Sequence, residues 1–157
     1  MINELRINAR VTRRFSASPQ RVFDAWLDSK TARRWLFATA RGHITCAEID
    51  GRAGGWFSIV ERRNGEDFHH MGEYLELVRP HRLVFILFAE KYSLDFERVT
   101  VVFHPHGSGC ELSLTHETTT EMADQVSRDW SHVLDSLAAV LGKSGCDTEF
   151  RVSEVQR

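Results

Sequence analysis

The feature that most constrains the fold is a long amphipathic helix near the C-terminus. Apolar residues recur at intervals of three and four from Ala123 to Leu141, which predicts a helix of about 20 residues with one apolar face. Thr118 and Glu121 have the spacing of a capping box, which predicts the start of this helix, and Gly142 predicts its end. A helix of this kind must bury its apolar face against another large apolar surface.

The preceding chain supplies that surface as β-strands. Residues 5–15 alternate between two faces, and six further runs between residues 44 and 117 have a period near two. Asn64-Gly65 is the strongest hairpin signal between these runs. Strands grouped in this way, with helices segregated to one side, predict an α+β fold. We expect a curved antiparallel sheet of about seven strands that wraps around the long helix.

Two short helices are predicted between the first and second strands. Ser18 is a good N-cap and Pro19 suits the first position of one helix, and the other helix covers about residues 30–36. These helices interrupt the sheet and leave room between it and the long helix. A cavity of a few hundred Å³, roughly the scale of ligand pockets, is therefore expected there.

Length and composition limit the function classes. A chain of 157 residues predicts one domain, at residues 1–142, followed by a flexible polar tail at 143–157. The net charge of −2 argues against a nucleic-acid partner. No apolar run is long enough to span a membrane, and residues 1–6 lack the apolar stretch of a secretory signal, so a cytoplasmic location is expected. The three cysteines are widely spaced and should be reduced.

Five segments of the chain resemble, in order, those of a known family. They are FSASPQRVFDAW at 15–26 with ARRW at 32–35, DGRAGG at 50–55, GEYLE at 72–76 with PHRLV at 80–84, VTV at 99–101, and LSLTHE at 112–117. Together they resemble the activator of Hsp90 ATPase homologue 1-like (AHSA1-like) family of the Bet v 1/START-like (SRPBCC) superfamily, over about residues 8–142. The resemblance implies the helix-grip fold and a hydrophobic cavity. It does not imply one activity, because the superfamily includes binders, transporters, cyclases and co-chaperones.

The first functional hypothesis is a module that binds a small apolar or amphipathic molecule between the sheet and the long helix. Trp35 and Phe37 lie where the short helices meet the sheet, beside the expected opening. No cofactor is expected. The residues predicted to contact the ligand are Trp35, Phe37, Phe57, Tyr74, Phe85, Phe103, His116, Trp130 and Leu134.

The second hypothesis is an enzyme of the polyketide cyclase, dehydratase or hydrolase type. His116 continues the inward face of its strand, where a histidine is suited to proton transfer. Tyr74 and Glu76 lie on one face of another strand and would add a hydroxyl and a carboxylate if that face is inward. The structural alternative is a hydrogen-bonded His116 at a strand end and a Glu76 that is solvated or paired with an arginine.

A third hypothesis rests on the family resemblance alone, and is an Hsp90-type co-chaperone or a stress-response interaction module. It would make an Hsp90 homologue the partner. A metal site is not predicted: the pairs His69-His70 and His104/His106 lie at turns, and no helix supplies a third ligand at a matching spacing.

The run from Leu83 to Phe88 is apolar on both faces, whereas only one face of the sheet can meet the long helix. Either Val84, Ile86 and Phe88 or their neighbours in the run therefore need a second cover. The short helices or a second subunit would supply it, so the sequence leaves a monomer and a homodimer open.

Overall fold

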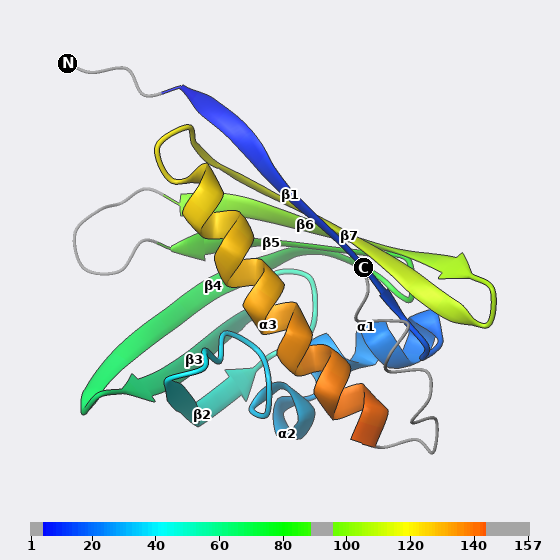
Figure 1. Ribbon diagram of the computed structural model, residues 1–157, viewed down its shortest axis with the longest axis horizontal. Coiled ribbons are helices and arrows are strands. Elements are labelled where there is room, and N and C mark those ends of the chain that lie inside the picture. The colour runs from blue at the N-terminus through cyan, green and yellow to red at the C-terminus, as the bar shows by residue number, and fades with distance from the viewer. Residues whose placement is uncertain (1–4, 89–95, 144–157) are drawn as a thin grey trace.

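A computed structural model describes residues 5–88 and 96–143 (Figure 1). The elements are β1 (Arg6–Phe15), α1 (Pro19–Leu27), α2 (Ser29–Ala32), β2 (Gly42–Ile49), β3 (Trp56–Arg63), β4 (Glu66–Val78), β5 (Arg82–Phe88), β6 (Phe96–His106), β7 (Gly109–Thr119) and α3 (Ala123–Lys143). Apart from Lys143, the predicted C-terminal tail lies outside the described residues.

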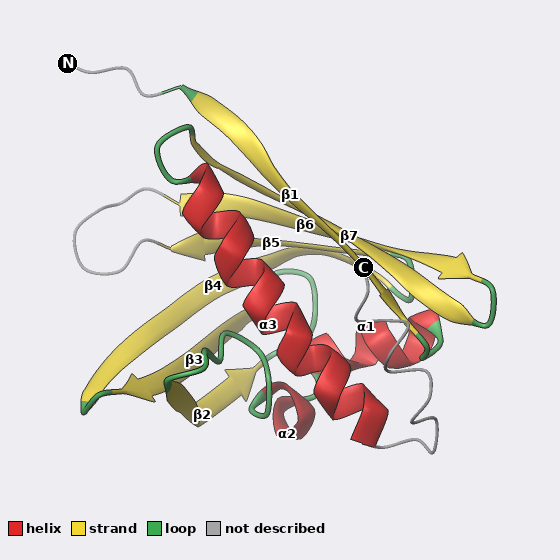
Figure 2. Cartoon of the chain, viewed as in Figure 1, coloured by secondary structure: helices red, strands yellow, loops and turns green. Residues whose placement is uncertain are grey.

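The strands form one antiparallel seven-stranded sheet in the order β1-β7-β6-β5-β4-β3-β2. β1 pairs with β7 over its whole length, so the first and last strands are neighbours. Figures 1 and 2 show α3 lying across one face of the curved sheet, with α1 and α2 near its C-terminal end. This arrangement confirms the predicted α+β helix-grip fold, including the two short helices between β1 and β2.

The core lies between α3, α1 and the inner face of the sheet. Leu134 and Leu137 of α3 are fully buried, in one core cluster with apolar residues of β5, β6 and β7. From α1, the ring of Phe23 packs edge-on against Phe103 at 5.2 Å between centroids, and Trp26 contacts Phe85 at 6.2 Å. These side chains of α3 therefore belong to the packed core.

Of the two predicted N-terminal caps, the one of α1 is correct and the one of α3 is wrong. The Ser18 hydroxyl accepts a hydrogen bond from the Arg21 N–H at 3.2 Å, which confirms the predicted cap of α1. The capping box at Thr118 and Glu121 is wrong, because α3 begins only at Ala123. Thr118 and Thr119 stay in β7, where they pair with the start of β1. Their backbone is part of the sheet, so Thr118 cannot serve as the N-cap of α3.

Three smaller predictions concern a turn and the ends of two helices. Asn64 and Gly65 have φ angles of 53° and 78°, as a tight hairpin turn requires, and they join β3 to β4 as predicted. The second short helix, predicted at about 30–36, is shorter and ends at Ala32. Gly142 does not end α3, which continues to Lys143.

The apolar run in β5 is covered mostly within the chain. Val84 and Ile86 are only 1% and 8% exposed, whereas Phe88 is 41% exposed. The short helices do not provide this cover, because α1 packs on the inner face, against Phe85 and Phe103. Val84 instead lies between Glu76 of β4 and Thr100 of β6 on the outer face.

Candidate ligand-binding pocket

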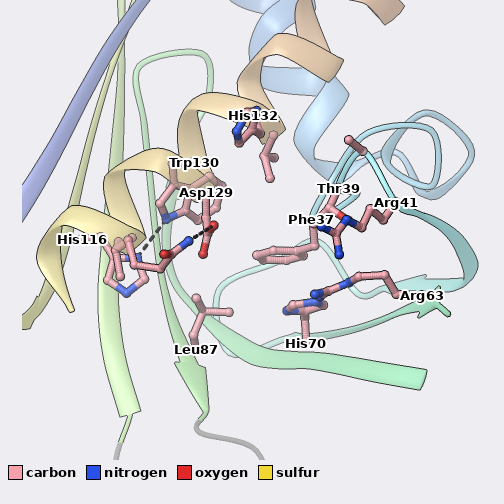
Figure 3. A pocket seen from close by; sticks show the side chains of 14 residues that line it. Phe37, Thr39, Arg41, Arg63, His70, Leu87, His116, Asp129, Trp130 and His132 are labelled. Carbon is pink, nitrogen blue, oxygen red and sulfur yellow. Dashed lines mark hydrogen bonds between the residues drawn. The ribbon is translucent and has the colours of Figure 1, made fainter. Parts of the chain in front are cut away.

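A pocket of about 560 Å³ opens between the first half of α3 and the sheet (Figure 3). Its walls come from the loop between α2 and β2, from β3, β4, β5 and β7, and from α3. It is lined by Phe37, Thr39, Ala40, Arg41, Arg63, His70, Leu87, His116, Gln125, Val126, Asp129, Trp130, His132 and Val133.

The pocket has an apolar interior and a polar rim. Phe37, Leu87, Trp130, Val126 and Val133 supply the apolar surface. The polar groups divide by sign in Figure 3. Two arginines, Arg41 and Arg63, come from the loop and β3 on one side, and the carboxylate of Asp129 comes from α3 on the other. Such a lining suits a molecule with an apolar body and a polar end.

Phe37 is the centre of the aromatic interior. Its ring stacks on His70 with centroids 4.5 Å apart and planes 6° apart, as Figure 3 shows. It also stacks on Phe57 at 6.0 Å and contacts Trp130 at 5.6 Å. The backbone of Phe37 has φ 65°, a left-handed conformation that bulky residues rarely adopt. The short loop after α2 thus turns sharply to place this ring under α3.

A buried carboxylate holds this loop in place. Glu61 of β3 is fully buried and accepts hydrogen bonds from the Thr39 N–H at 3.0 Å and from the Thr39 hydroxyl. Its other oxygen accepts from Arg63 Nε at 3.1 Å. Since both oxygens are occupied, the Glu61 charge is compensated, and the wall of the pocket is fixed to β3.

His116 lies at the inner end of the pocket, with both ring nitrogens engaged. Trp130 Nε1 donates to His116 Nδ1 at 2.9 Å. Because an indole nitrogen can only donate, Nδ1 must accept, and the proton of the neutral ring lies on Nε2. From there it is donated to Glu97 Oε1 at 2.6 Å. His116 therefore has no free lone pair for a general base in this geometry.

Glu97 completes the network around His116. Burial alone would raise the pKa of Glu97, but the hydrogen bonds from His116 and the Thr118 hydroxyl and the charge of Arg6 outweigh burial and lower it. The Thr118 hydroxyl donates to Glu97 Oε2 at 3.3 Å. The carboxylate stays ionised, so it can hold His116 in one tautomer.

The structure does not bring the three predicted proton-transfer residues together. Tyr74 is buried away from the pocket, and burial, assisted by the charge of Asp50, raises the pKa of its hydroxyl. The prediction that Tyr74 and Glu76 share a face is wrong. A register shift between them turns Glu76 to the outer face, where it pairs with Arg82 at 3.2 Å. Of the three, His116 alone lines the pocket.

The predicted ligand contacts fall into three groups. Phe37, His116 and Trp130 line the pocket. Trp35, Phe103 and Leu134 are buried in the core, and Trp35 Nε1 donates to the Ala25 carbonyl at 3.1 Å. The third group lines a separate void of about 10 Å³ and consists of Phe57, Tyr74 and Phe85.

Several polar residues of the pocket were missed by sequence reasoning. For Arg63 the signal was present, because it continues the inward alternation of Phe57, Ile59 and Glu61 along β3. His70 was assigned to a turn, but it lies within β4, where it reaches Phe37. Asp129 and His132 flank the apolar stripe of α3, where helical periodicity does not distinguish the pocket rim from solvent.

Within residues 5–88 and 96–143, no three His, Cys, Asp or Glu side chains are placed to hold a metal ion. None of the helices in that part of the chain is long and apolar enough to cross a membrane.

The sheet, the long helix and the pocket between them define an SRPBCC/START-like helix-grip domain. The family model of the activator of Hsp90 ATPase homolog 1-like proteins matches residues 16–142, and the chain belongs to this family. No match was found among curated proteins.

Solved structures with the same fold come from several bacteria. A Chromobacterium violaceum protein is 26% identical, with a TM-score of 0.77, over 85% of this chain and 95% of the other. An AHSA1-like protein from Aeromonas hydrophila is 22% identical, with a TM-score of 0.78, over 88% of this chain and 94% of the other. A Staphylococcus aureus protein of unknown function is 18% identical, with a TM-score of 0.80, over 92% and 98%.

Proposed function

We propose that this chain is a binding protein for a small amphipathic molecule, held in the pocket between α3 and the sheet. The observation that carries the proposal is the pocket itself. Its volume of about 560 Å³ is in the range of ligand sites, roughly 300–1,000 Å³. An apolar interior with a few polar groups at its rim would bury the body of a ligand and orient its polar end.

The polar end of the ligand is expected near the two arginines. Arg63 is held by Glu61, so its charge is partly compensated. Arg41 makes no ion pair with another residue of the described ranges and is exposed at the pocket rim. An oxygen acceptor on the ligand would find Arg41 as its donor.

Binding is favoured over catalysis by the geometry of His116. A cyclase, dehydratase or hydrolase needs a proton-transfer group with a free lone pair or proton directed at the substrate. Trp130 and Glu97 occupy both nitrogens of His116, and Tyr74 and Glu76 lie elsewhere. The co-chaperone hypothesis rests on the family description alone, and stimulation of the host Hsp90 homologue's ATPase would test it.

A cytoplasmic location is part of the proposal. It is supported by two cysteines of the described ranges, Cys46 and Cys110, which form no disulfide. Burial raises the pKa of Cys110 to about 12, so this thiol stays protonated and unreactive.

Native mass spectrometry of protein purified from its own host tests the proposal. A co-purifying small molecule is expected on the wild-type chain. Val126→Trp should remove it, because Val126 lines the pocket and the indole would fill it. Ala139→Trp is the matched control, since Ala139 is exposed on α3 outside the pocket, and this variant should keep the molecule. Equal loading of all three proteins would overturn the pocket as the binding site.

A further inference from the structure

Phe37 separates two spaces in the interior. On one side lies the pocket, and on the other lies the void of about 10 Å³, which is large enough for about one water. Phe37 is the residue that borders both of them. The void is otherwise lined by Trp26, Leu36, Phe57, Tyr74, Leu83 and Phe85.

One residue that lines the void has an unused hydrogen-bonding group. Trp26 lines it, and the buried Nε1 of Trp26 has no hydrogen-bond partner within the described part of the chain. Buried N–H groups are normally paired, so a site that leaves one unpaired calls for an explanation. By contrast, the other two tryptophans of the interior, Trp35 and Trp130, donate to Ala25 and His116.

Phe37 is also held in an unusual way. Its φ of 65° is a conformation that costs a bulky residue free energy and persists only where the surroundings impose it. The ring lies between His70, Phe57 and Trp130, as a planar ligand would lie in an aromatic slot. Figure 3 shows the Phe37 ring lying over His70 among the side chains that line the pocket.

We propose that Phe37 is a removable plug, and that an aromatic ligand bearing a neutral hydrogen-bond acceptor displaces it and binds the Trp26 indole N–H. The inference deepens the proposed function and rests on it, because the ligand enters through the same pocket. Rotation of the Phe37 side chain joins the void to the pocket. The ligand ring takes the place of the Phe37 ring, and its carbonyl or ether oxygen satisfies Trp26 Nε1.

The chemistry of the inner space restricts the acceptor to a neutral group. Apart from Tyr74 and Trp26, the void is lined by apolar side chains, and a desolvated carboxylate would find no cation there. Tyr74 stays protonated, because burial raises the pKa of its hydroxyl. Charged parts of a ligand would remain at the rim, near Arg41.

Indole N–H resonances of the ¹⁵N-labelled full chain provide the test, with acetophenone as the probe and α-methylstyrene as its isostere without the oxygen. The Trp26 resonance is assigned by its loss in Trp26→Phe. Acetophenone should move the Trp26 indole proton downfield at saturation, and α-methylstyrene should not. Wild type should bind acetophenone about 2- to 12-fold more tightly than its isostere, and Trp26→Phe should remove this preference.

Variants of the plug provide the second readout. Phe37→Gly removes the ring, and glycine adopts a φ of 65° without strain. Because the inner space is then already open, this variant should bind acetophenone at least about 10-fold more tightly than wild type. Phe37→Ala serves if the glycine variant does not fold. Val133→Ala is the control, because it enlarges the outer pocket without opening the void, and its affinity should stay within about 3-fold of wild type.

The outcomes separate this inference from the proposed function. If acetophenone perturbs Trp130 but leaves Trp26 unchanged, the pocket binds ligands and the inner subsite is wrong. If Trp26 does not respond in wild type or in Phe37→Gly, the inference is overturned, and an N–H···π contact with a neighbouring ring is the better account of Trp26. The Val126→Trp comparison then decides the proposed function independently.

Discussion

Trp130 of α3 donates a hydrogen bond from Nε1 to Nδ1 of His116 in β7, across 2.9 Å. This contact fixes the tautomer of His116 and ties the first half of α3 to the sheet beside the pocket. A histidine that the sequence marks as a candidate base is therefore an acceptor toward the helix and a donor toward Glu97.

Trp130→Phe should destabilise the fold by about 1–3 kcal/mol, because it leaves the buried Nδ1 of His116 without its donor. Urea unfolding measures this change. The ¹⁵N shifts of the His116 ring provide the mechanistic readout: in wild type at neutral pH, Nδ1 should be unprotonated and Nε2 protonated. A proton on Nδ1 in the wild-type protein would contradict the hydrogen bond from Trp130.

The stability of the fold should fall in mild acid through Glu97. Its pKa is lowered in the folded chain from the ordinary value of 4.5, so the stabilisation is complete above that value and is lost as pH falls through the lower native pKa. Glu97→Gln keeps an acceptor for the His116 N–H and removes the charge.

Urea midpoints measured from about pH 6 to pH 3 compare the two chains. The wild type should lose more stability over this range than Glu97→Gln. Glu76→Gln is the matched control, because Glu76 pairs with Arg82 on the exposed outer face. Parallel curves for wild type and Glu97→Gln would show that Glu97 contributes nothing to the acid dependence.

Glu61→Ala should destabilise the fold by about 3–5 kcal/mol, because it leaves Arg63 and the Thr39 N–H without the carboxylate that joins them. Thr39→Val removes only the hydroxyl bond and should cost about 1 kcal/mol. Thermal or urea unfolding distinguishes the two. If the costs are equal, Glu61 does not hold the pocket wall through its charge.

The sequence predicted the parts of the fold that depend on regular patterns. Leu134 and Leu137 lie on one helical stripe and are both fully buried, and Asn64-Gly65 forms its hairpin. Local irregularities were not predictable. The register shift after Tyr74 reverses the face of Glu76, and the pairing of Thr118 with Ile7 of β1 displaces a cap that looks sound locally. Both depend on neighbouring strands.

The candidate site was predicted less completely than the fold. Phe37, His116 and Trp130 were among the residues predicted to contact the ligand, and the structure puts them around the pocket. Arg41 lies in a loop without a periodic pattern, so its position depends on the turn at Phe37 and on the contact of Thr39 with Glu61. Such contacts between distant residues leave no trace in sequence spacing.

The chain should sediment as a monomer. The homodimer hypothesis came from the apolar run in β5. Within one chain, Val84 and Ile86 of this run are only 1% and 8% exposed, so these side chains need no second subunit. Phe88 and Phe96 remain more exposed and lie edge to face at 6.5 Å on neighbouring strands. Sedimentation velocity over a wide range of concentrations tests the expectation. If a dimer forms, Phe88→Asp should dissociate it. Leu5→Asp is the control, because Leu5 is exposed just before β1, and this variant should leave the dimer intact. A dimer that resists Phe88→Asp would show that its interface lies elsewhere.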